Sequence, residues 1–155
     1  VEVSQFERAN ASESFERTLE VVGSLAVQFY QRGYALGLMT NGVVEGGPPF
    51  LSMGRSPQKL PSILEILARM KMRTNGGLVD TMCRIPELPW GVSCVHFSYE
   101  QDEKTTAAAQ YFSHRKIPMI FVVCSSRSQW EGDGHGPGSR TYCLDEIHME
   151  EAREP

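Results

Sequence analysis

The chain has 155 residues, a formal net charge of -4, and 41% hydrophobic against 22% charged residues. That length suits one domain with a hydrophobic core, and the composition is that of a globular protein rather than a disordered one. The negative charge and the lack of a basic stripe argue against nucleic acid as a partner. No apolar run approaches the roughly 20 residues that a membrane-spanning helix needs, so we expect no membrane contact by this chain.

The first third of the sequence alternates between strand and helix patterns. Residues 1–4 are predicted to end a first strand, and apolar residues at helical spacing predict a helix over 15–30. The apolar run 34–40 stops at an Asn-Gly turn, which predicts a buried strand. Two prolines precede Phe50–Gly54 ("FLSMG"), so this segment suits an antiparallel edge strand better than a central one.

The middle of the chain continues the alternation. Ser56, followed by a proline, predicts the cap of a helix with an apolar face, and residues 78–85 form a weaker amphipathic piece. The apolar run 92–97 predicts a buried strand after a Pro-Trp-Gly turn. A helix is expected to begin at Asp102 or Glu103, where an acidic residue complements the helix dipole.

The C-terminal part contains one more buried strand, over 117–124. Residues 125–140 are rich in Gly, Ser and Arg, so we expect a mobile surface loop there. A last short strand is expected over 141–144, and the acidic tail 145–155 is expected to be a frayed helix or disordered.

This alternation of strands and helices predicts an α/β fold with one doubly wound, mostly parallel sheet. Helices should cover both faces of this Rossmann-like sheet, with one antiparallel edge strand, and the right-handed crossover rule leaves few topologies. We expect residues 1–155 to form a single domain. Because the chain begins with Val1 inside a predicted strand and without methionine, we also expect it to be a piece of a longer protein.

The order of these parts resembles a known bacterial family. The segments "FERTLEVVGSLAVQFYQRGYALGLMTNG" and "RIPELPWGVSCVHFSYEQDEKTTAAAQYFSHRKIPMIFVVC" carry the resemblance. They share their ordered motifs with domain-of-unknown-function family fifty-eight, whose C-terminal part has a von Willebrand factor A-like fold. The resemblance implies a cytoplasmic domain of a membrane-associated bacterial protein, and as partner an ATPase of the MoxR type. It implies no established catalytic activity.

Von Willebrand A-like domains bind a divalent ion through Asp-x-Ser-x-Ser after the first strand, a Thr from a second loop and an Asp after the fourth strand. Here "EVSQF" stands at the first motif, with Glu2 at the Asp position, Ser4 at the first Ser and Phe6 at the second. Ser56 is the nearest hydroxyl to the expected Thr, and Glu100 or Asp102 approximates the last Asp. One ligand is lengthened and one is lost, so we expect no metal and no other cofactor.

The sequence therefore predicts a non-catalytic protein-interaction module with a degenerate metal-ion site. A protein partner would bind the C-terminal rim of the sheet, formed by Ser4, Gln5, Asn41, Ser56, Ser98 and Glu100. The alternative is a divalent-metal-dependent binding domain or hydrolase. It would hold Mg²⁺ or Mn²⁺ with Glu2, Ser4, Ser56, Glu100 and Asp102. A third alternative is a structural remnant that only supports its parent protein.

Overall fold

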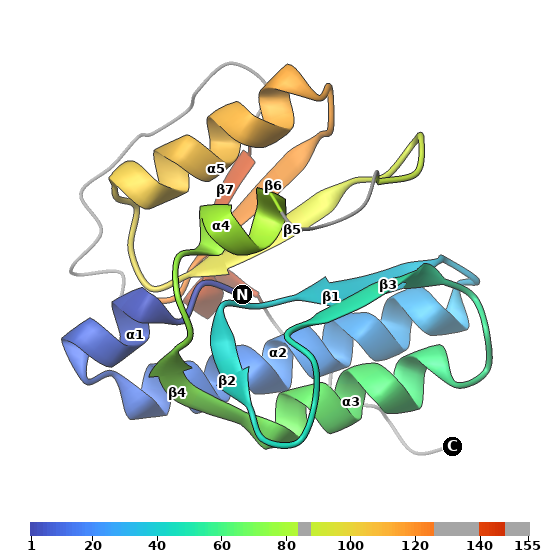
Figure 1. The fold of residues 1–155 in the computed structure, drawn as a ribbon, viewed down its shortest axis with the longest axis horizontal. Coiled ribbons are helices and arrows are strands. Elements are labelled where there is room, and N and C mark those ends of the chain that lie inside the picture. Colours follow the sequence, from blue (N-terminus) through green and yellow to red (C-terminus); the bar gives the residue numbers. More distant parts are fainter. Residues whose placement is uncertain (84–87, 126–139, 148–155) are drawn as a thin grey trace.

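The computed structural model describes residues 1–83, 88–125 and 140–147. Its elements alternate between helices and strands along the chain (Figure 1). The helices are α1 (Ser4–Ala9), α2 (Ser12–Gln31), α3 (Lys59–Arg69), α4 (Leu78–Cys83) and α5 (Glu103–His114), followed by a 3-10 turn at Leu144–Glu146. The strands are β1 (Leu36–Met39), β2 (Gly42–Val44), β3 (Phe50–Gly54), β4 (Met70–Thr74), β5 (Cys94–Ser98), β6 (Met119–Val123) and β7 (Arg140–Cys143).

The strands form three small hydrogen-bonded groups. β1 pairs with β3 and β2 with β4, both antiparallel, whereas β5, β6 and β7 form a parallel three-stranded sheet. The mixed α/β class, the antiparallel strand over Phe50–Gly54 and the parallel strands of the second half are therefore confirmed. The strand predicted to end over residues 1–4 differs from the structure: residues 1–3 are not part of a strand, and helix α1 begins at Ser4.

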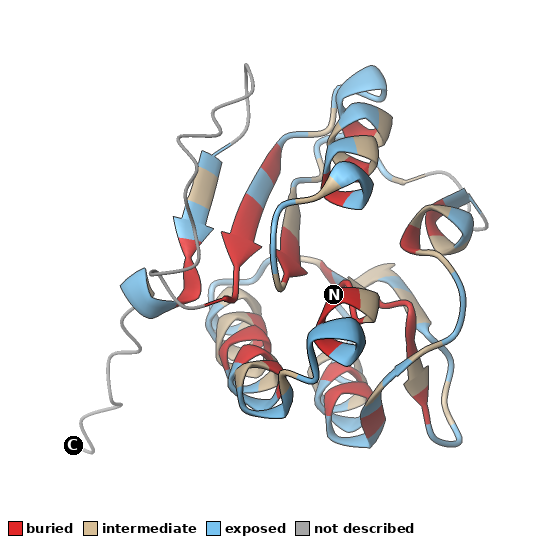
Figure 2. Ribbon diagram, turned by 90° about the vertical axis from the view of Figure 1, so that its left-hand side faces the viewer, coloured by how far each residue is buried: buried red, intermediate tan, exposed pale blue. Residues whose placement is uncertain are grey.

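Helices lie on two sides of the strands. α4 and α5 are on one side, and α2 and α3 are on the other (Figures 1 and 2). Buried residues are concentrated on the surfaces that these helices turn towards the strands (Figure 2). The arrangement follows from the sequence, because α2 and α3 each carry an apolar stripe at helical spacing.

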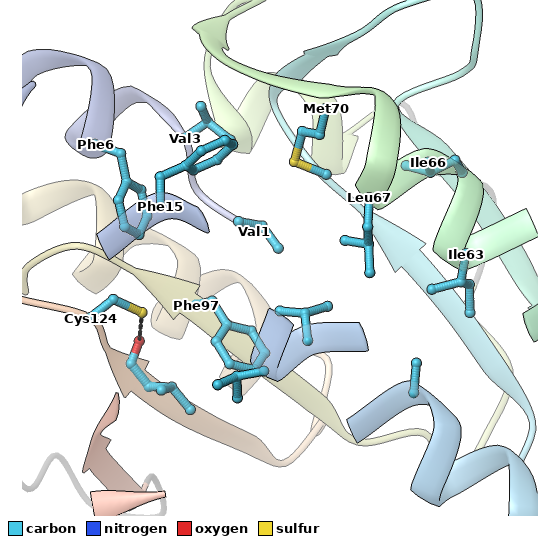
Figure 3. Packing of buried hydrophobic residues seen from close by; sticks show 14 of the residues in the cluster. Val1, Val3, Phe6, Phe15, Ile63, Ile66, Leu67, Met70, Phe97 and Cys124 are labelled. Carbon is cyan, nitrogen blue, oxygen red and sulfur yellow. Dashed lines mark hydrogen bonds between the residues drawn. The ribbon is translucent and has the colours of Figure 1, made fainter. Parts of the chain in front are cut away.

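Two hydrophobic clusters fill the spaces between helices and strands. The larger one joins α1, α2 and α3 to the strands, and Val1 lies between Phe97 and Leu67 within it (Figure 3). The smaller cluster lies under α4 and α5 and includes Phe112 and Phe121. Neighbouring residues of β6 belong to different hydrophobic clusters: Phe121 is part of the smaller cluster and Val122 is part of the larger cluster. This alternation is what two covered faces of a strand require.

One further local prediction differs from the structure, one lies outside it, and two strands were not predicted. Helix α3 begins at Lys59 after Gln58, and the Ser56 side chain does not cap it. β2 and β4 carry no clear strand pattern, and β4 follows α3 directly with no glycine or proline between them. Most of the expected loop and tail, residues 126–139 and 148–155, lies outside the described residues.

Candidate functional site at the strand ends

A buried glutamate lies where the first segment of the chain turns into α1. The Glu2 side chain is 1% exposed, and its Oε1 atom accepts hydrogen bonds from the Ser4 backbone nitrogen at 2.8 Å and from the Ser4 hydroxyl. Nδ2 of Asn41 donates to the same oxygen at 3.0 Å. Oε2 is also buried and has no hydrogen-bond partner within the described residues. A buried carboxylate needs such donors because it has lost its hydration.

Asn41 holds three segments together at this point. It lies two residues after the end of β1, and its Oδ1 atom accepts from the Val3 backbone nitrogen at 2.7 Å. Nδ2 also lies 3.4 Å from the carbonyl oxygen of Gly76, and the Asn75 backbone nitrogen donates to the Asn41 carbonyl at 2.8 Å. The turn is tight, since a Cβ atom at Gly42 would lie 2.8 Å from Cγ2 of Val3. The Asn-Gly pair thus lets the end of β1 approach the first residues of the chain.

The end of β5 lies on the other side of the site from Asn41. Oε1 of Gln5 accepts from the Glu100 backbone nitrogen at 3.0 Å, which joins α1 to the segment after β5. Ser98 ends β5 with a fully buried hydroxyl that has no hydrogen-bond partner in the described part of the chain. Asp102 then caps α5 by accepting from the Thr105 backbone nitrogen at 3.0 Å.

The pKa of the Asp102 carboxyl is lowered. Partial burial favours its neutral form, but the Gln5 amide and the Thr105 donors outweigh that effect. Nε2 of Gln5 has no hydrogen-bond partner within the described residues, so the Gln5 amide lowers the pKa of Asp102 through its dipole rather than through a hydrogen bond. A helix that begins at Asp102 or Glu103 was predicted from sequence and is confirmed.

Charged side chains cover these buried groups. One guanidinium nitrogen of Arg8 lies 2.5 Å from Oε1 of Glu100 and 3.6 Å from Oδ2 of Asp102. Hydrogen bonding to Glu100 raises the pKa of Arg8. Nζ of Lys104 donates to the Ser4 hydroxyl at 3.1 Å. The rim thus has a buried hydrogen-bonded layer and an exposed ionic layer.

A further contact ties α1 to β4. Oε2 of Glu7 accepts from the backbone nitrogen of Thr74 at 2.8 Å and from its hydroxyl at 2.6 Å. These two hydrogen bonds lower the pKa of the Glu7 carboxyl. The C-terminal end of β4 therefore belongs to the site, although nothing in the sequence placed it there.

The structure brings together five of the six residues predicted for the rim. Gln5, Asn41 and Ser98 are at most 1% exposed, whereas Ser4 and Glu100 reach the surface. Ser56 lies elsewhere: it follows β3, whose last residue Gly54 pairs with Leu36 at the start of β1, the opposite end from Asn41. The antiparallel direction of β3 causes this separation.

Sequence reasoning missed Arg8, Lys104 and Glu7 at the rim. Their partners are far away in the chain, and local patterns carry no signal for contacts of that kind. Glu7 and Arg8 directly follow the motif "EVSQF" in the sequence, and this position is the one local signal that could have indicated them as rim residues.

A buried histidine lies one layer behind the rim. His96 is in β5, 5% exposed, with its ring 5.4 Å from that of Phe121. Burial lowers the pKa of His96 to about 3, helped by the positive nitrogen of Val1. His96 is therefore neutral at pH 7.

Oxygen atoms of Glu2, Ser4 and Asp102 are the ligand type that a hard cation prefers. Within residues 1–83, 88–125 and 140–147, no three His, Cys, Asp or Glu side chains gather as a metal site would need. A surface hollow of about 430 Å³ lies between α2, α3 and β4, and no rim residue lines it.

Comparison of the chain with family models, curated proteins and solved structures finds no match. Among the helices of the described residues, none has the length and apolar character needed to cross a bilayer.

Proposed function

We propose that this domain is a non-catalytic protein-interaction module of a von Willebrand A-like type, with a degenerate metal-ion site at its rim. The backbone around Val1 supports the doubly wound sheet. The nitrogen of Val1 donates to the Met39 carbonyl at 2.7 Å, and the nitrogen of Glu2 donates to the Phe97 carbonyl at 2.8 Å. Residues 1–3 thus bridge β1 and β5, in the order β3, β1, residues 1–3, β5, β6, β7.

The observation that carries the proposal is the ionic layer above the buried rim. Arg8 reaches Glu100 and Asp102, yet the Arg8 and Glu100 side chains remain 57% and 49% exposed. Exposed ion pairs add little to stability, so these residues contribute more to recognition than to folding. Charge complementarity mainly sets partner choice and association rate. The contact surface we propose consists of Ser4, Arg8, Glu100 and Lys104.

This proposed contact surface contains only some of the residues that the sequence predicted for the rim. Gln5, Asn41 and Ser98 are buried, so they hold the surface in place rather than contact a partner. Ser56 lies at the other end of β1 and β3 and is left out. The first partner to test is a MoxR-type ATPase encoded beside the parent gene, which would place the domain on the cytoplasmic side of a membrane-associated protein.

The test is a binding titration of the immobilised domain with that ATPase, with and without ATP. Exchanging the rim charges, in the double variant Arg8→Glu and Glu100→Arg, keeps an ion pair but reverses its direction. It should weaken binding at least tenfold, a loss of about 1.4 kcal/mol. The matched control is the same exchange at Glu65 and Arg69, an ion pair of 2.7 Å on α3. Equal binding by the two variants would refute the proposed surface.

A second candidate function is a divalent-metal-dependent binding domain or hydrolase that uses the rim carboxylates. The buried Oε2 atom of Glu2, which has no hydrogen-bond partner in the described residues, favours it. Thermal unfolding in chelator and in millimolar Mg²⁺, Mn²⁺ or Ca²⁺ tests this candidate, because an ion that binds only the folded state raises Tm. A rise of several degrees that a Glu2→Ala and Glu100→Ala double variant abolishes would favour metal chemistry over the interaction module.

A further inference from the structure

The edge of the fold opposite the rim is where β1, β5 and β6 begin. Leu36 of β1 pairs with Gly54, the last residue of β3, and Cys94 of β5 pairs with Met119 of β6. The two pairs lie at the same level, because the bridge formed by residues 1–3 contacts β1 and β5 three residues further along each strand. Four turns therefore lie at this edge, along the right-hand and upper sides of Figure 1: residues 32–35, 54–58, 88–93 and 115–118.

These four turns, which we call the basic edge, carry positive charge although the chain as a whole is acidic. The sequence contains 19 Asp and Glu against 15 Lys and Arg, yet the four turns contain no acidic residue. Their four basic side chains are exposed, and none forms an ion pair with another described residue: Arg32, Arg55, Arg115 and Lys116. The basic edge thus has an excess of positive charge in a chain of net charge -4.

Two large aromatic side chains lie on the same edge. Trp90 is fully exposed at the tip of its turn, and the side chain of Tyr34 is 58% exposed. Removing so much apolar surface from water is favourable, so both rings are suited to contact with another medium. Trp and Tyr are the residues that gather where a lipid bilayer meets water, and basic side chains beside them are attracted to anionic headgroups.

We propose that the basic edge docks on an anionic membrane surface, with the indole of Trp90 among the headgroups. The expectation of no membrane contact rested on the lack of apolar runs long enough to span a bilayer, and a peripheral contact needs no such run. Single-stranded nucleic acid also combines phosphates with stacking bases, but its proteins follow the strand with a basic groove. The hollow between α2, α3 and β4 is lined by none of the four turns. The inference is independent of the proposed function, because the rim lies at the opposite edge.

The first experiment follows the fluorescence of Trp90 in a Trp130→Phe variant, because the chain has two tryptophans. Vesicles that contain phosphatidylserine should shift the emission to the blue, whereas vesicles of phosphatidylcholine alone should not. Raising the ionic strength should reduce the shift, since salt screens exposed charges. Co-sedimentation of the unchanged chain with the same vesicles makes the comparison without any substitution. No binding, or equal binding to both kinds of vesicle, would overturn the proposal.

Charge reversal identifies the surface that binds. The double variant Arg32→Glu and Arg55→Glu should bind phosphatidylserine vesicles at least tenfold more weakly, because both exposed cations become anions near a negative surface. The matched control is Lys71→Glu with Arg73→Glu, which changes the net charge equally at exposed positions of β4. It should retain most of the binding. An equal loss in the control would mean that vesicles respond to net charge alone and would overturn the proposal.

Trp90→Ala gives an independent readout that leaves the charge unchanged. It should weaken vesicle binding about fivefold or more, and its full exposure means that the fold loses no packing. Unchanged binding by Trp90→Ala would overturn the role given to the indole. A single-stranded oligodeoxythymidine should not displace the chain from the vesicles, and displacement at a similar concentration would overturn the proposal in favour of nucleic acid.

Discussion

Asn41 and Glu2 are joined by a hydrogen bond of 3.0 Å between Nδ2 and Oε1, although 39 residues separate them in the chain. The same asparagine binds the Val3 backbone nitrogen at 2.7 Å through its other side-chain atom. Asn41 therefore fixes the first segment of the chain against the end of β1. Every proposed rim contact depends on this arrangement, since Ser4 and Arg8 follow that segment directly.

Asn41→Ala should lower the free energy of unfolding by about 2–4 kcal/mol. It leaves a buried N–H of Val3 without its acceptor and removes one donor from Glu2, and unsatisfied buried groups cost about 1–3 kcal/mol each. Urea unfolding followed by circular dichroism measures the effect. Asn75→Ala is the control, because the exposed Asn75 contributes its backbone nitrogen to the site and should lose little. Similar losses in both variants would contradict the role assigned to Asn41.

The sequence predicts those elements whose pattern is local. Helices α2 and α5 and strands β1, β3, β5 and β6 combine apolar periodicity with a clear stop or cap signal, such as Gly33 with its φ of 78°. β2 has three residues and β4 alternates in burial without a turn signal before it, so neither is distinguishable from its surroundings. Their pairing depends on tertiary contacts rather than on propensity.

The rim is only partly predictable for a related reason. The prediction grouped Ser4, Asn41 and Ser98 as residues at the ends of parallel strands, but only Ser98 ends a strand of the parallel sheet, since Ser4 begins α1 and Asn41 comes after β1, which pairs antiparallel with β3. Which of these side chains would be buried depends on packing by α1, a helix that the sequence did not indicate. Ser56 was misplaced because its position follows from the antiparallel direction of β3 and the length of the following turn.

Asp102→Ala should lower the free energy of unfolding by about 1 kcal/mol, because α5 loses its N-terminal cap. Asp102→Asn should retain most of the stability, since its side-chain oxygen still accepts from the Thr105 nitrogen. The lowered pKa of Asp102 adds a pH dependence: its contribution is present above the unfolded pKa of about 3.8 and is lost as the pH falls through the folded value. Urea unfolding at pH 7 and pH 3 measures both effects. Glu103→Ala, at an exposed neighbour, is the control, and an equal loss there would speak against the cap.

His96 predicts a loss of stability in mild acid. Its folded pKa is about 3 and its unfolded pKa about 6.5, so protonation favours the unfolded chain. The stabilisation is complete above pH 6.5 and declines progressively as the pH falls towards 3. His96→Phe, which keeps an aromatic ring against Phe121, should flatten stability between pH 6.5 and 4. An unchanged pH profile in His96→Phe would exclude His96 as the source.

Gly23→Ala should raise the free energy of unfolding by about 0.5–1 kcal/mol, because alanine restricts the unfolded chain more than glycine and suits the interior of α2. The added Cβ would lie 3.6 Å from Cδ2 of Leu64 and 3.7 Å from Cδ1 of Leu67, which is ordinary contact with α3.

Gly37→Ala gives the opposite expectation, since its Cβ would lie 2.9 Å from the Leu51 carbonyl oxygen, between β1 and β3. Backbone atoms there cannot move aside, so a loss of about 1–3 kcal/mol is expected. Urea unfolding measures both variants: Gly23→Ala tests the contact between α2 and α3, and Gly37→Ala tests the contact between β1 and β3. A destabilised Gly23→Ala would mean that α2 and α3 lie closer together than described.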